Sequence, residues 1–161
     1  MRKHVISVLV ENKFGVLARI SGLFSARGYN IDSLCVAETL DPTLSKMTIV
    51  TQGDDQVIEQ INKQLNKLVD IVKVLDFTGL DHVDRELVLI KVAATDSNRS
   101  AIVEITDIFR AKVVDVAPKS LTVEITGTSD KVNAFLELLR PYGIREIART
   151  GRIAMSRGSV G

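Results

Sequence analysis

The sequence has 161 residues, of which 45% are hydrophobic and 25% charged, and it contains only 10 Gly and 3 Pro. This composition is typical of a folded protein with one ordinary domain or two small ones, and it argues against a disordered chain. The formal net charge is +1, and aromatic residues make up 4% with no Trp. Such a chain has no overall field to attract nucleic acid or an anionic membrane surface, and few side chains on which bases could stack.

The distribution of apolar residues and cysteine favours a cytoplasmic protein. No unbroken apolar run approaches the roughly 18 residues of a membrane span, and the N-terminal residues lack the apolar region of a secretory signal. Cys35 is the single cysteine, so neither an intrachain disulfide nor a cysteine-based zinc site is expected. We therefore expect no membrane and no nucleic-acid partner, and we interpret Cys35 as a small buried residue of a strand.

Few residues in the sequence could carry out catalysis. The two histidines, His4 and His82, lie far apart without metal-ligand spacing, and each is expected on the surface or in a connector. The glycine-containing motifs of serine hydrolases, nucleotide hydrolases and dinucleotide-binding proteins do not occur. The sequence therefore predicts no catalytic residues and no metal site.

Hydrophobic periodicity predicts a βαββαβ order in the first half of the chain. Leu17, Ile20, Leu23 and Phe24 lie on one stripe of a helix that Gly28 ends. The predicted elements are a strand at 4–11, a helix from 16 or 17 to 27, strands at 30–37 and 45–52, a helix that follows a cap at 54 or 55 and reaches 68, and a strand at 69–76.

The same order begins again after a polar connector. The predicted elements are a strand at 87–92, a helix at 99–109, strands at 112–116 and 121–125, a helix at 132–139 and a strand at 144–150. We therefore predict an α+β protein with two ferredoxin-like βαββαβ domains. The first would occupy residues 1–78 and the second residues 85–161, joined by a linker at 79–84.

The loop that precedes the first helix, from Asn12 to Leu17, could bind a small anion. Gly15 would let the backbone approach a ligand, and the free N–H groups and the dipole of the first helical turn favour a carboxylate. The alternative is structural: Asn12 caps a turn, and Gly15 satisfies the dihedral angles of the loop. An RNA-binding module of the same fold is disfavoured because the third strands, 45–50 and 120–125, contain no aromatic residue.

Segments spread along the whole chain resemble the small regulatory subunits of acetolactate synthase, a family whose N-terminal part is an ACT domain. In the first half they are 11–12, 15–20, 22–25, 27–31, 41–49 and 60–70. In the second half they are 85–87, 109–110, 114–116, 149–151 and 156–158. One departure is Phe14, where many ACT loops place proline before the glycine.

The resemblance implies that two ACT domains pair and bind a branched-chain amino acid, typically valine, at their junction. The implied ligand-binding residues are Asn12, Gly15, Val16, Leu17, Asn30 and Ile31. Asn12 and the backbone of Gly15 and Val16 would meet the carboxylate, and Leu17 would line the cleft. Asn30 and Ile31 would come from the partner chain. Asp32 could face the ammonium group of the ligand, or it could be a solvated carboxylate at the end of a strand.

The resemblance also implies a partner, the large catalytic subunit of acetolactate synthase. That subunit would hold thiamine diphosphate, Mg²⁺ and FAD, whereas this chain would hold no cofactor. This chain would activate it and make it subject to feedback inhibition by valine, and possible further effectors are leucine and isoleucine. The alternative is a stand-alone amino-acid sensor that acts on another partner, such as a transcription regulator.

The end of the sequence is locally basic. Five arginines and one glutamate follow position 139, namely Arg140, Arg145, Arg149, Arg152, Arg157 and Glu146. They could form a solvated terminal face or contact an acidic surface of a partner.

Overall fold

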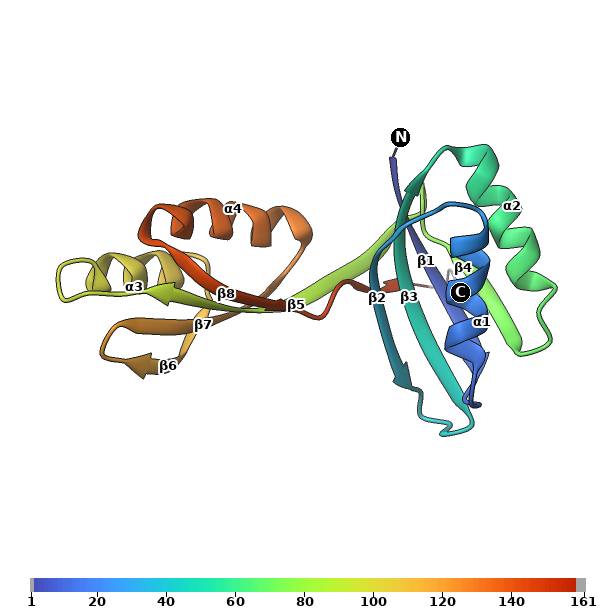
Figure 1. Ribbon diagram of the computed structural model, residues 1–161, viewed down its shortest axis with the longest axis horizontal. Helices are drawn as coiled ribbons and strands as arrows, with labels where there is room; N and C mark the ends of the chain where they lie inside the picture. Colours follow the sequence, from blue (N-terminus) through green and yellow to red (C-terminus); the bar gives the residue numbers. More distant parts are fainter. Residues whose placement is uncertain (1, 159–161) are drawn as a thin grey trace. The chain divides into compact units, whose positions relative to one another are not determined.

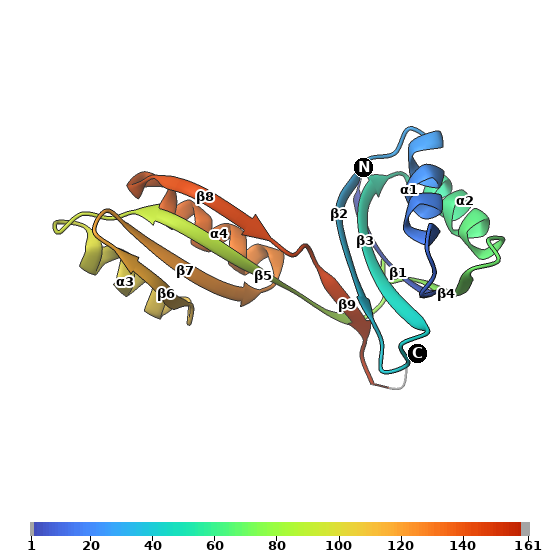
Figure 2. The same ribbon diagram turned by 60° about the horizontal axis from the view of Figure 1, so that its bottom comes forward.

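The computed structural model describes residues 2–158, which form two compact units. The first unit contains the chain up to Val83 and the segment that begins at Arg152, and the second spans Asp84–Gly151. Each unit has an antiparallel sheet with two helices on one face (Figures 1 and 2). The predicted α+β class with two βαββαβ units is therefore confirmed.

The first unit has a four-stranded sheet in the order β2-β3-β1-β4, so β2 and β4 are its edge strands. Its elements are β1 (Arg2–Glu11), α1 (Val16–Ala26), β2 (Ile31–Glu38), β3 (Leu44–Gly53), α2 (Asp55–Asn66) and β4 (Ile71–Asp76). The alternation in β1 directs Ile6, Val8 and Val10 toward the helices, where Phe24 and Ile61 complete a buried core. Gly28, at φ +73°, follows the last turn of α1, as predicted.

A short C-terminal strand, β9 (Ile153–Ser156), covers part of the other face of this sheet. Ala154 packs with Val5, Val50 and Phe77 in a small buried cluster. The second domain predicted at 85–161 includes these residues, whereas the structure groups them with the first unit. The physical reason is the apolar surface that β1 and β3 present on this face, which β9 removes from water.

The second half of the predicted linker at 79–84 lies within a strand, because β5 (His82–Ala93) begins at His82. The His82 ring lies 5.2 Å from that of Phe77, centroid to centroid, and its Nδ1 lies 2.8 Å from the Leu80 carbonyl oxygen. Cys35 lies in a strand, as predicted, but its side chain is only partly buried.

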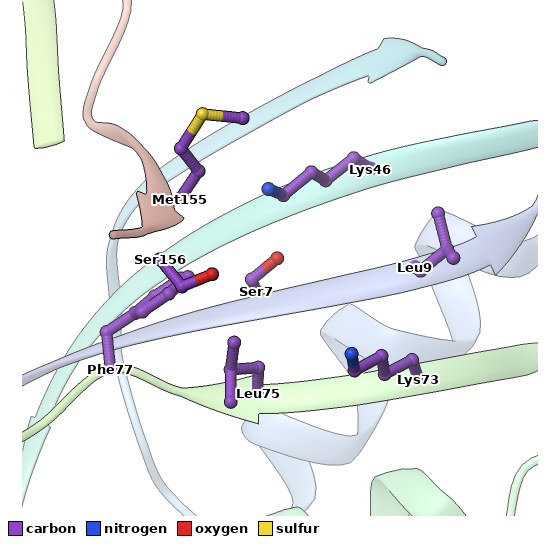
Figure 3. A pocket seen from close by; sticks show the side chains of 8 residues that line it. All are labelled: Ser7, Leu9, Lys46, Lys73, Leu75, Phe77, Met155 and Ser156. Carbon is purple, nitrogen blue, oxygen red and sulfur yellow. The ribbon is translucent and has the colours of Figure 1, made fainter. Parts of the chain in front are cut away.

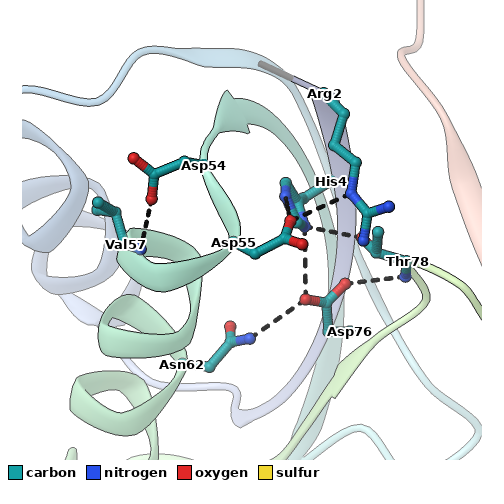
Figure 4. A network of polar contacts seen from close by, with 8 residues as sticks. All are labelled: Arg2, His4, Asp54, Asp55, Val57, Asn62, Asp76 and Thr78. Carbon is teal, nitrogen blue, oxygen red and sulfur yellow. Dashed lines mark hydrogen bonds and ion pairs between the residues drawn. The ribbon is translucent and has the colours of Figure 1, made fainter.

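His4, expected on the surface, is 2% exposed, so that prediction was wrong. The alternation of β1 turns His4 to the same face as the core residues, beneath the start of α2. Its Nε2 lies 3.3 Å from Asp55 Oδ1, and its Nδ1 lies 2.8 Å from Thr78 Oγ1 and 3.6 Å from Asp76 Oδ2 (Figure 4). Arg2 Nε donates to the same Asp55 oxygen at 3.1 Å. The network ties β1, β4 and the start of α2 together.

The second unit has the sheet order β6-β7-β5-β8, and β9 also pairs with β5. Its elements after β5 are α3 (Arg99–Ile108), β6 (Lys112–Ala117), β7 (Ser120–Gly127), α4 (Ser129–Leu139), a 3₁₀ turn (Arg140–Tyr142) and β8 (Ile144–Arg149). Ile90, Val123, Ile102 and Phe135 are all buried in a core of its own.

Three of the five C-terminal arginines form ion pairs within their own unit. The pairs are Arg140–Glu137 at 2.8 Å, Arg157–Asp81 at 3.1 Å and Arg149–Glu86. Much of the local excess of positive charge is therefore balanced inside the chain.

Candidate functional site

The loop between β1 and α1 is held to the β2–β3 hairpin by Asn12. Its backbone N–H donates to Thr43 O at 2.8 Å, and its side-chain Nδ2 donates to Pro42 O at 3.1 Å. The same Nδ2 lies 3.4 Å from Glu38 Oε1. Asn12 is therefore a structural tie between two loops, and the residue is exposed.

Gly15 precedes the first residue of α1 and has φ +86°, a left-handed conformation that side chains rarely adopt. A Cβ at this position would lie 3.4 Å from Arg19 Nη1. Glycine has no side chain that could cap the helix, and no side-chain cap is present. The glycine therefore provides both the turn and an open approach to the helix terminus.

The N-terminus of α1 provides the donors of this site. The Arg19 N–H donates to Gly15 O at 3.1 Å, which places the amides of Leu17 and Ala18 in the first turn, where a helix supplies no acceptor of its own. The partial positive charge of the helix dipole acts at the same place. The free amides and the dipole of such a helix end are suited to a small carboxylate.

The side chains around this terminus are paired with one another. Arg19 forms an ion pair with Asp70, and Lys13 Nζ lies 2.7 Å from Glu11 Oε2. The hydrogen bond to Glu11 raises the pKa of Lys13 above its ordinary value. Because the cations are already matched by carboxylates, the backbone amides are the free donors that a ligand would meet.

Val16 and Leu17 have different environments. The Val16 side chain is buried at 2% exposure, so a ligand could contact only its backbone, whose N–H donates to Lys13 O at 3.5 Å. Leu17 is 44% exposed beside the helix terminus and Phe14, before Gly15, is fully exposed. An apolar side chain on the ligand could therefore contact Leu17.

Asn30 and Ile31 lie at the opposite end of the sheet. Asn30 O accepts a hydrogen bond from Thr51 Oγ1 at 2.7 Å, and Ile31 pairs with the same threonine. Asn12 instead follows the end of β1 that pairs with Leu44. These two pairing positions, Leu44 and Thr51, are seven positions apart along β3, which is roughly 23 Å of strand. One chain therefore does not bring the six predicted residues around one small ligand.

Sequence reasoning missed the residues that support this loop. Asp70 lies far from Arg19 in sequence, and its backbone O also accepts from the Glu11 N–H at 2.9 Å. Pro42 contributes only a carbonyl oxygen. Neither contact has a local sequence signal, because each joins segments that meet only in the folded sheet.

Among residues 2–158, no helix is both long enough and apolar enough to cross a membrane. The same residues contain no cluster of three or more His, Cys, Asp or Glu side chains suited to a metal ion.

The βαββαβ fold, with a glycine-led helix terminus beside β1, fits the ACT class of domains. Consistent with this, a family model described as the AHAS small subunit-like ACT domain matches residues 6–73, and one for the small subunit of acetolactate synthase matches residues 85–158. The chain belongs to the acetolactate synthase small subunit family.

Relatives of similar length support this assignment. The chain is 57% identical over 157 residues to a probable acetolactate synthase small subunit of Archaeoglobus fulgidus, covering 98% of each chain. It is 54% identical to the acetolactate synthase small subunit of Aquifex aeolicus, covering 98% of this chain and 82% of the relative. The crystal structure of the small subunit from Thermotoga maritima matches with a TM-score of 0.89 and 44% identity, covering 99% of this chain and 100% of that one.

Proposed function

We propose that this chain is the non-catalytic regulatory subunit that activates the catalytic subunit of acetolactate synthase and confers feedback inhibition by valine. The observation that carries the proposal is the uncapped, Gly15-led terminus of α1, which offers backbone donors to a carboxylate beside the exposed Leu17. We assign effector binding to the ACT domain at residues 1–78. The second domain would begin at residue 85, with the segment from Arg152 returning to the first unit.

The effector site would be shared by two copies of the chain. β2 is an edge strand, and an exposed edge readily pairs with another strand. If two β2 strands pair antiparallel, the start of one, near Asn30, meets the end of the other, near Glu38. Asn12 lies beside that Glu38, so this pairing would bring the two distant halves of the predicted site together. Val36, 43% exposed on the helix-facing side of β2, offers apolar surface for such a homodimer.

The ligand would be a branched-chain amino acid. Its carboxylate would meet the Gly15 and Val16 backbone and the Asn12 amide, and its side chain would contact Leu17 and the partner's Ile31. One methylene changes binding by only about 1–3 kcal/mol, so leucine and isoleucine would act as weaker effectors than valine.

Regulation requires that valine binds two arrangements of the complex with different affinities, since a ligand that binds both equally shifts nothing. We infer that valine bridges two ACT domains and changes their packing against each other. Thiamine diphosphate, Mg²⁺ and FAD would be bound by the catalytic subunit, and the complex would be cytoplasmic.

The proposal is tested by mixing this chain with an acetolactate synthase catalytic subunit and measuring activity with and without valine. We expect wild type to activate the enzyme and to make it sensitive to valine. Gly15→Asp would place a carboxylate where that of valine binds, so valine inhibition is lost while activation remains. Full valine inhibition of the Gly15→Asp complex would overturn the site assignment.

Gly79→Asp is the matched control, because Gly79 also has a positive φ, +78°, with nothing within 4 Å of an added Cβ. It imposes similar backbone strain away from the site, so its complex should keep its valine response. If the chain binds valine but neither binds nor activates the catalytic subunit, the stand-alone sensor is the better description.

A further inference from the structure

A cavity of about 240 Å³ lies on the face of the first unit's sheet that is turned away from α1 and α2 (Figure 3). β1, β3 and β4 form its floor, and β9 lies at one end. It is separate from the terminus of α1, because Ser7 and Leu9 of its floor point to the opposite face from the core residues of β1.

Two lysines flank the centre of this cavity. Lys46 of β3 and Lys73 of β4 both pair with Leu9 of β1, one from each side, so their Cα atoms are two strand spacings apart, about 10 Å. Both side chains extend along their strands toward Ser7 (Figure 3). Two flexible ammonium groups at this separation can contact one anionic group between them.

Neither lysine is neutralised by the protein. Among the described residues, Lys46 and Lys73 form no ion pair. Glu11 follows Leu9 on the same face of β1, but its carboxylate forms an ion pair with Lys13 at 2.7 Å. Burial lowers the pKa of Lys46 below its ordinary value, as expected for a cation without an anionic neighbour. A bound anion would compensate both charges.

The rest of the lining is partly apolar. Leu75 lies on the same face as the lysines, and Met155 of β9, a flexible and polarisable side chain, borders the cavity. The hydroxyl groups of Ser7 and Ser156 add neutral donors and acceptors. The combination of concave shape, apolar wall and convergent polar groups is typical of small-molecule sites.

We propose that this cavity binds a small organic dianion, such as a phosphate monoester, with its charge between Lys46 and Lys73 and its apolar body against Leu75 and Met155. The cavity lies on the opposite face of the sheet from the proposed valine site. The chain would then bind a second ligand, on the face of the sheet opposite the helices.

The probe for this proposal is phenyl phosphate, titrated into this 161-residue chain at low salt. We expect saturable binding, with amide chemical-shift changes at Ser7, Leu9 and Leu75 in the NMR spectrum. Lys46→Met and Lys73→Met keep the aliphatic stem but remove the charge, so each should weaken binding about tenfold or more. Higher salt should also weaken it, because the attraction is electrostatic.

Lys67→Met is the control, since Lys67 is an exposed lysine after α2, outside the cavity. It should leave the affinity unchanged, and so should Gly15→Asp, which alters the other site. Benzoate, with one charge fewer, and inorganic phosphate, without the ring, should each bind more weakly than phenyl phosphate. The proposal is overturned if the named amides do not shift, if Lys67→Met weakens binding as much as Lys46→Met does, or if inorganic phosphate binds equally well.

Discussion

At the scale of single residues, Asp41 illustrates how the hairpin that supports Asn12 is built. Its Oδ1 accepts from the Thr43 hydroxyl at 2.7 Å and from the Thr43 N–H at 2.9 Å, and these bonds lower its pKa below the ordinary value. When the pH is above the unfolded-state pKa, near 3.8, the lowered folded-state pKa of Asp41 stabilises the folded protein. This stabilisation is lost as the pH falls through the folded-state pKa. The turn thus presents the Pro42 carbonyl to Asn12 best when Asp41 is ionised.

Thr43→Val removes the hydroxyl donor and keeps the side-chain shape, so the pKa of Asp41 should rise toward its ordinary value. The measurement is an NMR titration of the Asp41 carboxyl. Thr43→Ser retains a hydroxyl and should keep the pKa close to that of wild type. An unchanged pKa in Thr43→Val would show that the backbone N–H alone stabilises the carboxylate.

At the scale of elements, the helices of the chain differ in how they begin. α2 is capped by Asp54, whose Oδ1 accepts from the Val57 N–H at 3.0 Å, and α4 by Thr128, whose Oγ1 lies 3.4 Å from the Lys131 N. α1 has only Gly15 at this position. α3, which follows Asn98, also has no side-chain cap. At the proposed effector site on α1, a ligand could take the place of a capping side chain.

Asp54→Ala should lower the free energy of unfolding by about 1 kcal/mol, because α2 loses a side-chain cap. Thr128→Ala should cost less, since its hydrogen bond is longer. Chemical denaturation of each variant measures the difference, and Asp54→Asn, which keeps an acceptor, is the control. A larger loss in Thr128→Ala than in Asp54→Ala would contradict this ranking.

At the scale of the whole molecule, the chain returns to its first unit after completing the second. Ala154 is 6% exposed within the cluster formed with Val5 and Val50, whereas its neighbour Ile153 is 55% exposed. The stability of the first unit therefore depends on β9, which follows the second unit in the sequence.

Ala154→Asp should destabilise the first unit by roughly 1–3 kcal/mol, since it buries an unpaired carboxylate against an apolar cluster. Hydrogen exchange followed by mass spectrometry should show faster exchange in β1 and β3, with no change in β6 and β7. Ile153→Asp, on the exposed side of the same strand, should leave exchange as in wild type. Faster exchange confined to β6 and β7 would contradict the grouping of β9 with the first unit.

Local patterns predicted most of the fold. The 3.6-residue periodicity of α1 and its end at Gly28, and the alternation of β1 and β7, are recorded in contiguous residues, so each element could be placed without its partners. The loop with Asn12 and Gly15 could be found for the same reason, since glycine before an amphipathic helix is a local signal. Whether that loop binds valine stays a prediction.

The sequence by itself determined the α+β class, the two βαββαβ units and the family, because these depend on periodicity and on motifs ordered along the chain. Only the tertiary structure decided that His4 is buried under α2, that β9 joins the first unit, that Asn12 and Asn30 lie at opposite ends of one sheet, and that Lys46 and Lys73 flank one residue. Each of these depends on strand order and register. Strand order and register are set by the packing of apolar surfaces from segments that lie far apart in the sequence. No short segment contains that information.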